Sequence, residues 1–172
     1  MKKILLLSDT HGHLDAKIFS YMEEIDEVWH AGDIGNSKVL DSIEAKKPLR
    51  AVYGNIDGNK VKIKTKKVLN FECEGIKVVI THIAGYPGRY NQEAKNLIKK
   101  YQPNLFICGH SHILKVLSDR KYGHLHLNPG AVGLYGFHKT RTMIRFIIEN
   151  SKIKNLYVIE LGQRSKLSNA IN

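Results

Sequence analysis

Side chains that can bind metal ions follow five short apolar segments of this chain. Asp9 and His11 follow residues 4–7, Asp33 follows 28–31, Asn55 follows 51–53, His82 follows 78–81, and His110 and His112 follow 106–108. In open α/β sheets, ligands bind at the edge formed by the carboxyl ends of the strands. If the five segments are strands, these seven side chains lie at one edge and are candidate metal ligands.

The donor set suits two divalent ions rather than one. It contains three oxygen donors and four imidazoles, and sharing of Asp33 gives each ion four protein bonds. This mixture fits Mn, Fe, Zn, Ni or Co, because it is too rich in imidazole for Mg or Ca and lacks the thiolates of a structural zinc site. Two such ions ~3.5–4 Å apart activate water and clamp the oxygens of an in-line displacement. The chemistry that this predicts is hydrolysis of phosphate esters.

Strands and helices that would position these residues alternate over the first two thirds of the chain. The apolar spacing predicts strands at residues 4–7, 27–31, 49–53, 68–73, 77–81 and 105–108. It predicts helices over residues 13–25, from Asn36 or Ser37 through Ile43, and over residues 91–101. The βαβαβ opening indicates a parallel sheet.

The remaining third has the pattern of an all-β region. Strands are predicted at residues 114–119, 123–128, 131–137, 142–149 and 156–161. Lysines alternate with Val61, Ile63 and Thr65 over residues 60–66, which predicts an exposed edge ribbon. No linker or repeat divides the chain, so we expect a single domain over residues 1–161 and a polar tail over residues 162–172.

Length, charge and cysteine content narrow the class of protein. The 172 residues are enough to bury a sizeable core. The excess of 27 Lys and Arg over 16 Asp and Glu favours anionic partners. Cys73 and Cys108 show no C-x-x-C spacing, and the apolar opening is too short for a signal peptide. No apolar run is long enough to cross a bilayer, so a reduced, cytoplasmic protein is expected.

The motifs D-x-H, G-D, G-N, a strand-end H and G-H-x-H, in this order, resemble the calcineurin-type metallophosphoesterase superfamily. The opening S-D-T-H-G-H, the G-N-I-D segment and the N-P-G turn resemble its small YfcE-like phosphodiesterase branch, over residues 2 to 161. The resemblance implies an α/β fold of two packed mixed β-sheets flanked by helices, the four-layer metallophosphoesterase fold. It implies that one ion is bound by Asp9, His11, Asp33 and His112, and the other by Asp33, Asn55, His82 and His110.

The function expected from the residues and the resemblance is that of a dinuclear metal-dependent phosphodiesterase. A metal-bridging hydroxide would attack phosphorus in line, with Asp33 and Asn55 at the catalytic centre and Mn as the leading choice of metal. Many superfamily members have, directly after the motif Asn, a His that protonates the leaving group, but this chain has Ile56. General acids contribute ~10²–10⁴-fold. We therefore predict better turnover of aryl phosphodiesters than of alkyl phosphomonoesters.

Two further residues are candidates for catalysis. His13 is the nearest substitute acid, with an ordinary surface histidine at a helix start as the alternative interpretation. Arg89 lies on a Gly- and Pro-rich loop. Its guanidinium either makes two hydrogen bonds to a substrate phosphate or is exposed to solvent without such a role. The remaining histidines receive no catalytic role: His30, His124 and His126 are expected to be half-buried structural residues, and His138 lies on a turn with no visible partner.

Two other functions compete with the phosphodiesterase hypothesis. A eukaryotic retromer subunit that resembles this branch serves mainly to bind proteins, so a non-catalytic scaffold is one alternative, although all seven ligand positions are intact here. A nuclease is the other, but the chain has no room for the DNA-holding domains of the large repair nucleases. The expected partner is a small phosphodiester or phosphate ester, rather than nucleic acid or a membrane, and association into a homo-oligomer is left open.

Overall fold

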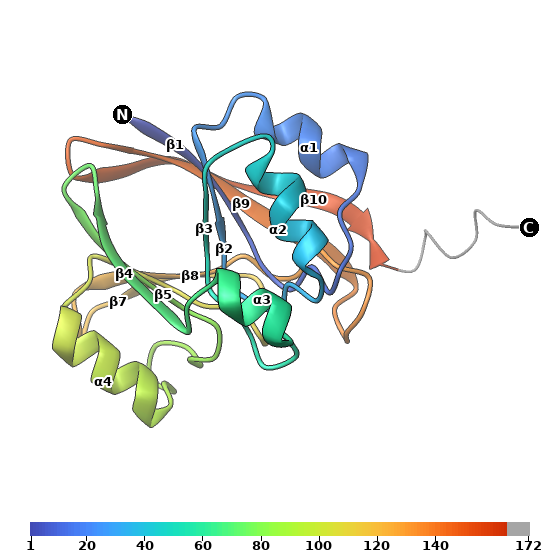
Figure 1. Cartoon of the computed structure of the whole chain (residues 1–172). Helices are drawn as coiled ribbons and strands as arrows, with labels where there is room; N and C mark the ends of the chain where they lie inside the picture. Colours follow the sequence, from blue (N-terminus) through green and yellow to red (C-terminus); the bar gives the residue numbers. More distant parts are fainter. Residues whose placement is uncertain (165–172) are drawn as a thin grey trace, which may run out of the picture.

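Two five-stranded mixed sheets pack face to face in the computed structural model, which describes residues 1–164 (Figure 1). The first sheet has the order β10-β9-β1-β2-β3, with β1 Lys2–Leu7, β2 Glu27–His30, β3 Leu49–Ala51, β9 Thr140–Glu149 and β10 Lys152–Gln163. The second has the order β4-β5-β6-β8-β7, with β4 Val68–Cys73, β5 Ile76–Thr81, β6 Leu105–Ile107, β7 Lys115–Asp119 and β8 His124–Asn128. Strands β1, β2 and β3 are parallel to one another, as are β5, β6 and β8.

Helices cover the outer faces of both sheets. Helices α1 (Ala16–Met22) and α2 (Ser37–Glu44) lie over the first sheet, and α4 (Gln92–Tyr101) lies over the second (Figure 1). The short α3 (Asn59–Lys64) follows β3. This arrangement confirms the predicted fold of two packed sheets flanked by helices. No helix within residues 1–164 is long and apolar enough to span a bilayer.

The continuously apolar sequence of β1 is explained by its position, because both faces of the strand are covered. Ile4 and Leu6 pack between the two sheets, where Trp29 and Phe146 also lie, whereas Leu5 packs under the helices of the first sheet. All of these side chains are buried, and the Trp29 ring meets Phe146 edge to face at 5.7 Å between centroids. A strand covered on both faces needs apolar residues at every position.

Helix α1 is shorter than the predicted helix over residues 13–25. The Asp15 carboxylate accepts a hydrogen bond from the Ile18 N–H and caps the helix, which begins at Ala16. The Arg141 guanidinium donates to the same carboxylate at 2.7 Å and ties this cap to β9. Residues 13–15 therefore belong to the loop that follows β1.

The predicted ribbon over residues 60–66 is wrong, because Asn59–Lys64 forms helix α3. The lysine alternation misled the prediction, since lysine is also a good helix former. Of the apolar residues in this segment only Val61 is buried, and Ile63 is 85% exposed. Lysine and apolar residues alternate in this segment, but the apolar side chains do not share one buried face as they would in a half-buried strand.

The predicted strand over residues 131–137 is also wrong, because this segment is a loop. Its backbone leaves the second sheet and follows the loop after β1, where the Val132 N–H donates to the Ser8 carbonyl and the Gly133 N–H to the Asp9 carbonyl. The backbone of this segment therefore hydrogen-bonds to the loop after β1 and not to a neighbouring strand. At the end of the chain β10 continues to Gln163, and positions 165–172 of the predicted tail lie outside the described residues.

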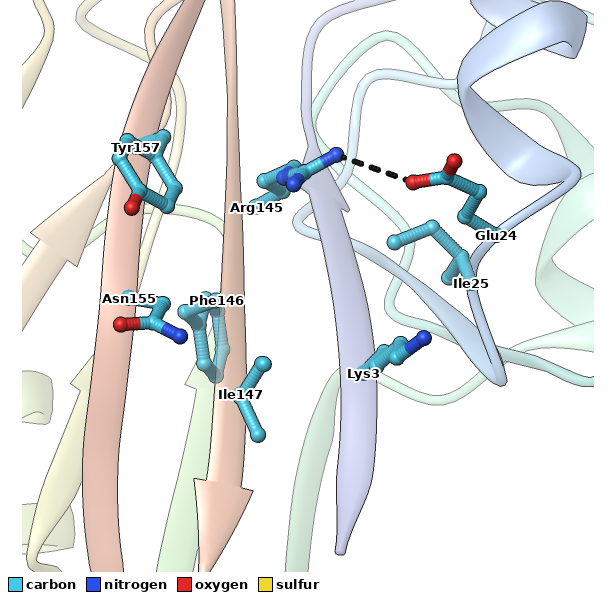
Figure 2. A pocket seen from close by; sticks show the side chains of 8 residues that line it. All are labelled: Lys3, Glu24, Ile25, Arg145, Phe146, Ile147, Asn155 and Tyr157. Atoms are coloured by element: carbon cyan, nitrogen blue, oxygen red, sulfur yellow. Dashed lines mark ion pairs between the residues drawn. The ribbon is translucent and has the colours of Figure 1, made fainter.

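A small hollow of about 130 Å³ opens on the outer face of the first sheet (Figure 2). It lies beside Lys3, near the amino-terminal end of β1, and Arg145 on its wall pairs with Glu24 at 3.6 Å. The carboxyl ends of the parallel strands lie at the other end of the sheet. The hollow therefore shares no residue with the candidate metal ligands.

Candidate metal centre

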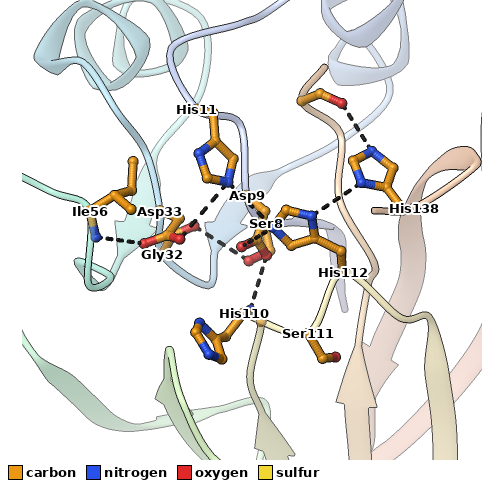
Figure 3. Close-up of polar contacts among 12 residues, drawn as sticks. Ser8, Asp9, His11, Gly32, Asp33, Ile56, His110, Ser111, His112 and His138 are labelled. Carbon is orange, nitrogen blue, oxygen red and sulfur yellow. Dashed lines mark hydrogen bonds and ion pairs between the residues drawn. The ribbon is translucent and has the colours of Figure 1, made fainter. Parts of the chain in front are cut away.

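All seven candidate ligands lie in loops at the carboxyl ends of five parallel strands. The first sheet supplies Asp9 and His11 after β1, Asp33 after β2 and Asn55 after β3, and the second supplies His82 after β5, and His110 and His112 after β6. Figure 3 shows loops from both sheets meeting at this edge. The structure thus brings together residues that are up to about a hundred positions apart in sequence.

One cluster contains Asp9, His11 and His112. The His112 Nε2 lies 3.1 Å from Asp9 Oδ1 and 3.3 Å from His11 Nε2 (Figure 3). Each residue offers one ligand atom, and these atoms lie within 4.8 Å of one another. One ion between them would contact all three.

A second cluster contains Asp33, His82 and His110. The His82 Nε2 lies 3.2 Å from Asp33 Oδ1, and the Asn55 Oδ1 lies 3.0 Å from His110 Nδ1. The Asn55 amide oxygen therefore faces the same space as the three clustered residues. Carboxylate, amide and two imidazoles supply four donors, which suits a divalent transition metal.

Asp33 lies between the two clusters. Its Oδ1 lies 3.2 Å from His82 Nε2. Its Oδ2 lies 3.9 Å from the Nε2 of His11, which belongs to the first cluster (Figure 3). The Ile56 N–H donates to Oδ1 at 3.1 Å and fixes the orientation of the carboxylate. One carboxylate oxygen is thus directed to each cluster, the geometry that a bridging ligand requires.

Unsatisfied polar atoms and charge at the two clusters fit bound cations. Asp9 Oδ1 and His82 Nε2 are buried without a hydrogen-bond partner, a state that costs free energy unless a ligand or ion satisfies it. The other His82 nitrogen, Nδ1, donates to the Ala31 carbonyl at 2.8 Å, which leaves the Nε2 lone pair free for a metal. Burial would raise the pKa of Asp33, but its contacts with His82 and with the Ile56 N–H hold the pKa below its usual value.

His138, to which the sequence assigned no partner, contacts a candidate ligand directly. Its Nε2 lies 3.1 Å from the Gly133 carbonyl, which can only accept, so Nε2 carries the proton. Burial lowers the pKa of His138 and favours its neutral form, in which Nδ1 is an acceptor. The His112 Nδ1, 3.1 Å away, then donates to it, and the His112 Nε2 lone pair faces the first cluster (Figure 3).

The ligand loops have an unusual backbone conformation. Five of the seven candidate ligands have positive φ angles, between 48° and 69°, namely Asp9, His11, Asp33, His110 and His112. Non-glycine residues seldom adopt this left-handed region, and such strain gathers at functional sites. Hydrogen bonds between loops hold it, since the Asp9 N–H donates to the Gly32 carbonyl and the His11 N–H to the Asp33 carbonyl.

Two buried side chains, Asp57 and His30, fix these loops through hydrogen bonds to backbone N–H groups. The Asp57 carboxylate accepts from the backbone N–H groups of Ile34, Gly35 and Gly54, which joins the loop of Asp33 to the loop of Asn55. His30 is fully buried rather than half-buried, and its Nδ1 accepts from the Gly32 N–H at 3.1 Å. Asp57 was not recognised from the sequence, although it ends the G-N-I-D segment.

The N-P-G turn lies under the G-H-S-H loop, near the site as the resemblance implied. The Asn128 side chain donates to the Gly109 carbonyl at 2.8 Å and to the Ser111 Oγ at 3.1 Å. The Gly130 N–H in turn donates to the Asn128 Oδ1. The turn thus fixes the backbone on both sides of His110.

His13 and Arg89 are placed differently from the seven ligands. The His13 Nε2 lies 3.6 Å from the Asp15 carboxylate, and no contact joins its ring to either cluster. Arg89 is exposed, and in residues 1–164 its side chain makes no hydrogen bond or ion pair. Ile56 is 47% exposed beside Asn55 and places an apolar group where a proton donor would be expected.

Comparison with known proteins identifies the family. Residues 1–151 match the calcineurin-like phosphoesterase superfamily domain. The chain is 28% identical over 133 residues to a probable metallophosphoesterase of Methanothermobacter thermautotrophicus, covering 73% of this chain and 74% of that protein. It is similar in structure to an archaeal phosphodiesterase (TM-score 0.70, 26% identity, 92% and 99% of the two chains). It shares its fold with Vps29 of Entamoeba histolytica (TM-score 0.69, 14% identity, 93% and 99% of the two chains). With its two mixed sheets and its strand-end Asp, Asn and His residues, the chain belongs to the calcineurin-like phosphoesterase superfamily.

Proposed function

We propose that this protein is a dinuclear metal-dependent phosphodiesterase. The observation that carries the proposal is the position of Asp33, which directs one carboxylate oxygen to each of two His and Asp clusters. The archaeal phosphodiesterase, similar in structure, supports the same reaction class. Two divalent ions, Mn as the leading choice, would supply the acidity that activates a water molecule and the charge that neutralises phosphoryl oxygens.

Residues of the chain position the donor atoms that would bind the ions. Asp33 and Asn55 come from neighbouring loops of the first sheet, and Asp57 fixes those two loops relative to each other. His82 and His112 present Nε2 because their Nδ1 atoms are hydrogen-bonded to Ala31 and His138. The loops therefore hold the donor atoms in position before substrate arrives, which lowers the cost of reorganisation.

The basic excess of the chain fits this function. Divalent ions at the strand ends would add to a formal charge of +11 and attract anionic phosphate esters. A small phosphodiester is the proposed substrate, rather than nucleic acid. A cytoplasmic location is supported by the two free, buried cysteines.

A protein-binding scaffold is the competing function, since Vps29 of Entamoeba histolytica shares the fold. Metal-dependent hydrolysis requires donor atoms directed at a common space, and all seven candidate ligands of this chain meet that requirement. The intact donor set therefore favours the enzyme.

The test combines metal analysis with hydrolysis of bis(p-nitrophenyl) phosphate. Purified protein should contain about two divalent transition-metal ions per chain and hydrolyse the diester, and Asp33→Ala and Asn55→Ala should each abolish turnover. Glu160→Ala, at an exposed position in β10, is the matched control. Absence of metal, or activity that survives both substitutions, would refute the proposal.

A further inference from the structure

A cavity of about 270 Å³ opens directly beside the second cluster. Thr81 and His82, both buried, line it together with Asn55. Tyr53 and Ile83 also line it. Since the cavity is lined by His82, a member of the second cluster, and by Asn55, which faces that cluster, a phosphate ester held there would direct one substituent into this space.

The lining of the cavity combines an aromatic ring, an apolar side chain and one unbalanced cation. Ile83 is 41% exposed, although it directly follows the buried His82. The Lys62 Nζ lies 5.5 Å from the centre of the Tyr53 ring. A second lysine, Lys67, pairs with Glu93 at 2.7 Å, which neutralises its charge. In residues 1–164 Lys62 has no carboxylate partner.

We propose that this cavity receives the leaving group of the phosphodiester, that this group is an aromatic or heteroaromatic ring, and that Lys62 is a catalytic residue which offsets the charge of the departing oxygen. This inference rests on the proposed function and adds the substrate class. Tyr53 would stack on the ring, an interaction that is worth more than area burial alone. A cavity of about 150 Å³ holds a benzene ring, so this one has room for a substituted or fused ring.

The reaction step shows why a cation is useful at this position. The attacking water gives up a proton to solvent as its oxygen forms a new bond to phosphorus, and the bond between phosphorus and the leaving oxygen breaks, with its electron pair passing to that oxygen. A phosphomonoester and, after protonation from solvent, a phenol or alcohol result. Ile56 offers no proton to the departing oxygen, so its negative charge needs electrostatic stabilisation. The Lys62 ammonium supplies it from the wall of the cavity.

The preference for an aromatic group follows from the same two features. Without a proton donor, the departing oxygen must carry charge, and a phenol stabilises that charge better than an alkyl alcohol. An apolar and aromatic cavity also binds a ring more strongly than a methyl group, because it removes more apolar surface from water. The stability of the departing oxygen and the apolar lining of the cavity therefore both favour esters with an aromatic leaving group.

The first experiment measures kcat/KM on methyl phenyl phosphate and methyl p-nitrophenyl phosphate, with Mn present. Lys62→Met should lower kcat/KM about fivefold to tenfold on the phenyl ester and less on the nitrophenyl ester, because phenolate is the poorer leaving group. Lys60→Met is the matched control, since Lys60 lies on the same helix but does not line the cavity. Lys62→Arg should restore part of the loss.

The second experiment detects ring binding without turnover. Saturation-transfer NMR with phenol and metal-free protein should show binding to the wild type and its loss in Tyr53→Leu. If the wild type hydrolyses no diester, the proposed function itself fails. If it does hydrolyse the diesters but Lys62→Met loses activity equally on both, or behaves like Lys60→Met, or phenol does not bind, then only the present inference is overturned.

Discussion

His138 and His112 face each other through their Nδ1 atoms at 3.1 Å, and His138 also donates from Nε2 to the Gly133 carbonyl. This chain of two bonds runs from a loop carbonyl to a candidate metal ligand. It sets which nitrogen of His112 keeps its lone pair, and so acts on the first cluster through one of its members without offering a ligand atom of its own. Partners of this kind orient ligating histidines in metal sites.

Replacing His138 by alanine should weaken metal binding about 10–100-fold, since His112 would lose the acceptor that fixes its tautomer. Titration against a chromophoric chelator measures the affinity. His138→Asn should keep part of it, because an amide oxygen can accept from His112 Nδ1. His13→Ala is the control, as His13 contacts Asp15 rather than a ligand. Equal affinity for His138→Ala and the wild type would contradict the role of His138.

Gly54→Ala should disrupt the second cluster. A Cβ at this position would lie 2.0 Å from the Asp33 Oδ1 and 2.4 Å from the Asp33 backbone nitrogen, so the carboxylate or the loop must move. Overpacking of this kind costs about 1–3 kcal/mol, and a misplacement of about 1 Å can lower activity about 10²-fold. Gly58→Ala is the matched control, since nothing lies within 4 Å of its Cβ position. Thermal unfolding and diesterase assays would separate the two variants.

Ile56→His should broaden the range of leaving groups. The substitution restores a proton donor beside Asn55 while keeping the backbone N–H that donates to Asp33. We expect turnover of alkyl esters to rise by about 10²-fold, at the low end of general-acid contributions, with little change on p-nitrophenyl esters. Ile56→Gln, which is polar but cannot deliver a proton in this way, should show no gain. A similar increase in both variants would exclude acid catalysis as the cause.

The metal-free protein should lose stability as the pH falls from about 6.5 to 4. Burial lowers the pKa of His30 and of His126 to about 4 in the folded state, against 6.5 for an ordinary histidine. The unfolded chain therefore binds more protons in this window, and each residue accounts for up to about 3 kcal/mol. His82 acts in the opposite direction, because Asp33 raises its pKa against the effect of burial.

Urea unfolding at several pH values, with a chelator present, measures this dependence. His126→Phe should make the free energy of unfolding less sensitive to pH between 4 and 6.5. The Tyr90 hydroxyl would lose one hydrogen-bonding partner but keep the other, His124 Nε2 at 3.0 Å. A slope equal to that of the wild type would show that His126 does not titrate in this way.

The candidate ligands were predictable because each follows an apolar strand, and parallel strands end at a common edge. His138 was not predictable, since its contact with His112 depends on the path of a loop that the apolar pattern presented as a strand. Asp57 binds three backbone N–H groups that come together only in the folded chain. The helix at Asn59–Lys64 was missed because its lysines fit two periodicities.

Each of the two clusters draws its donors from both sheets. Asp9 and His11 follow a strand of the first sheet and His112 one of the second, while Asp33 faces His82 across the same boundary. Bound ions would therefore link the two sheets, and each ion would add about 2.7 kcal/mol to the free energy of unfolding when free metal is at a hundred times its dissociation constant. Folding and metal supply become coupled, so a cell starved of the metal would degrade more of the protein, because changes of 1–2 kcal/mol alter abundance.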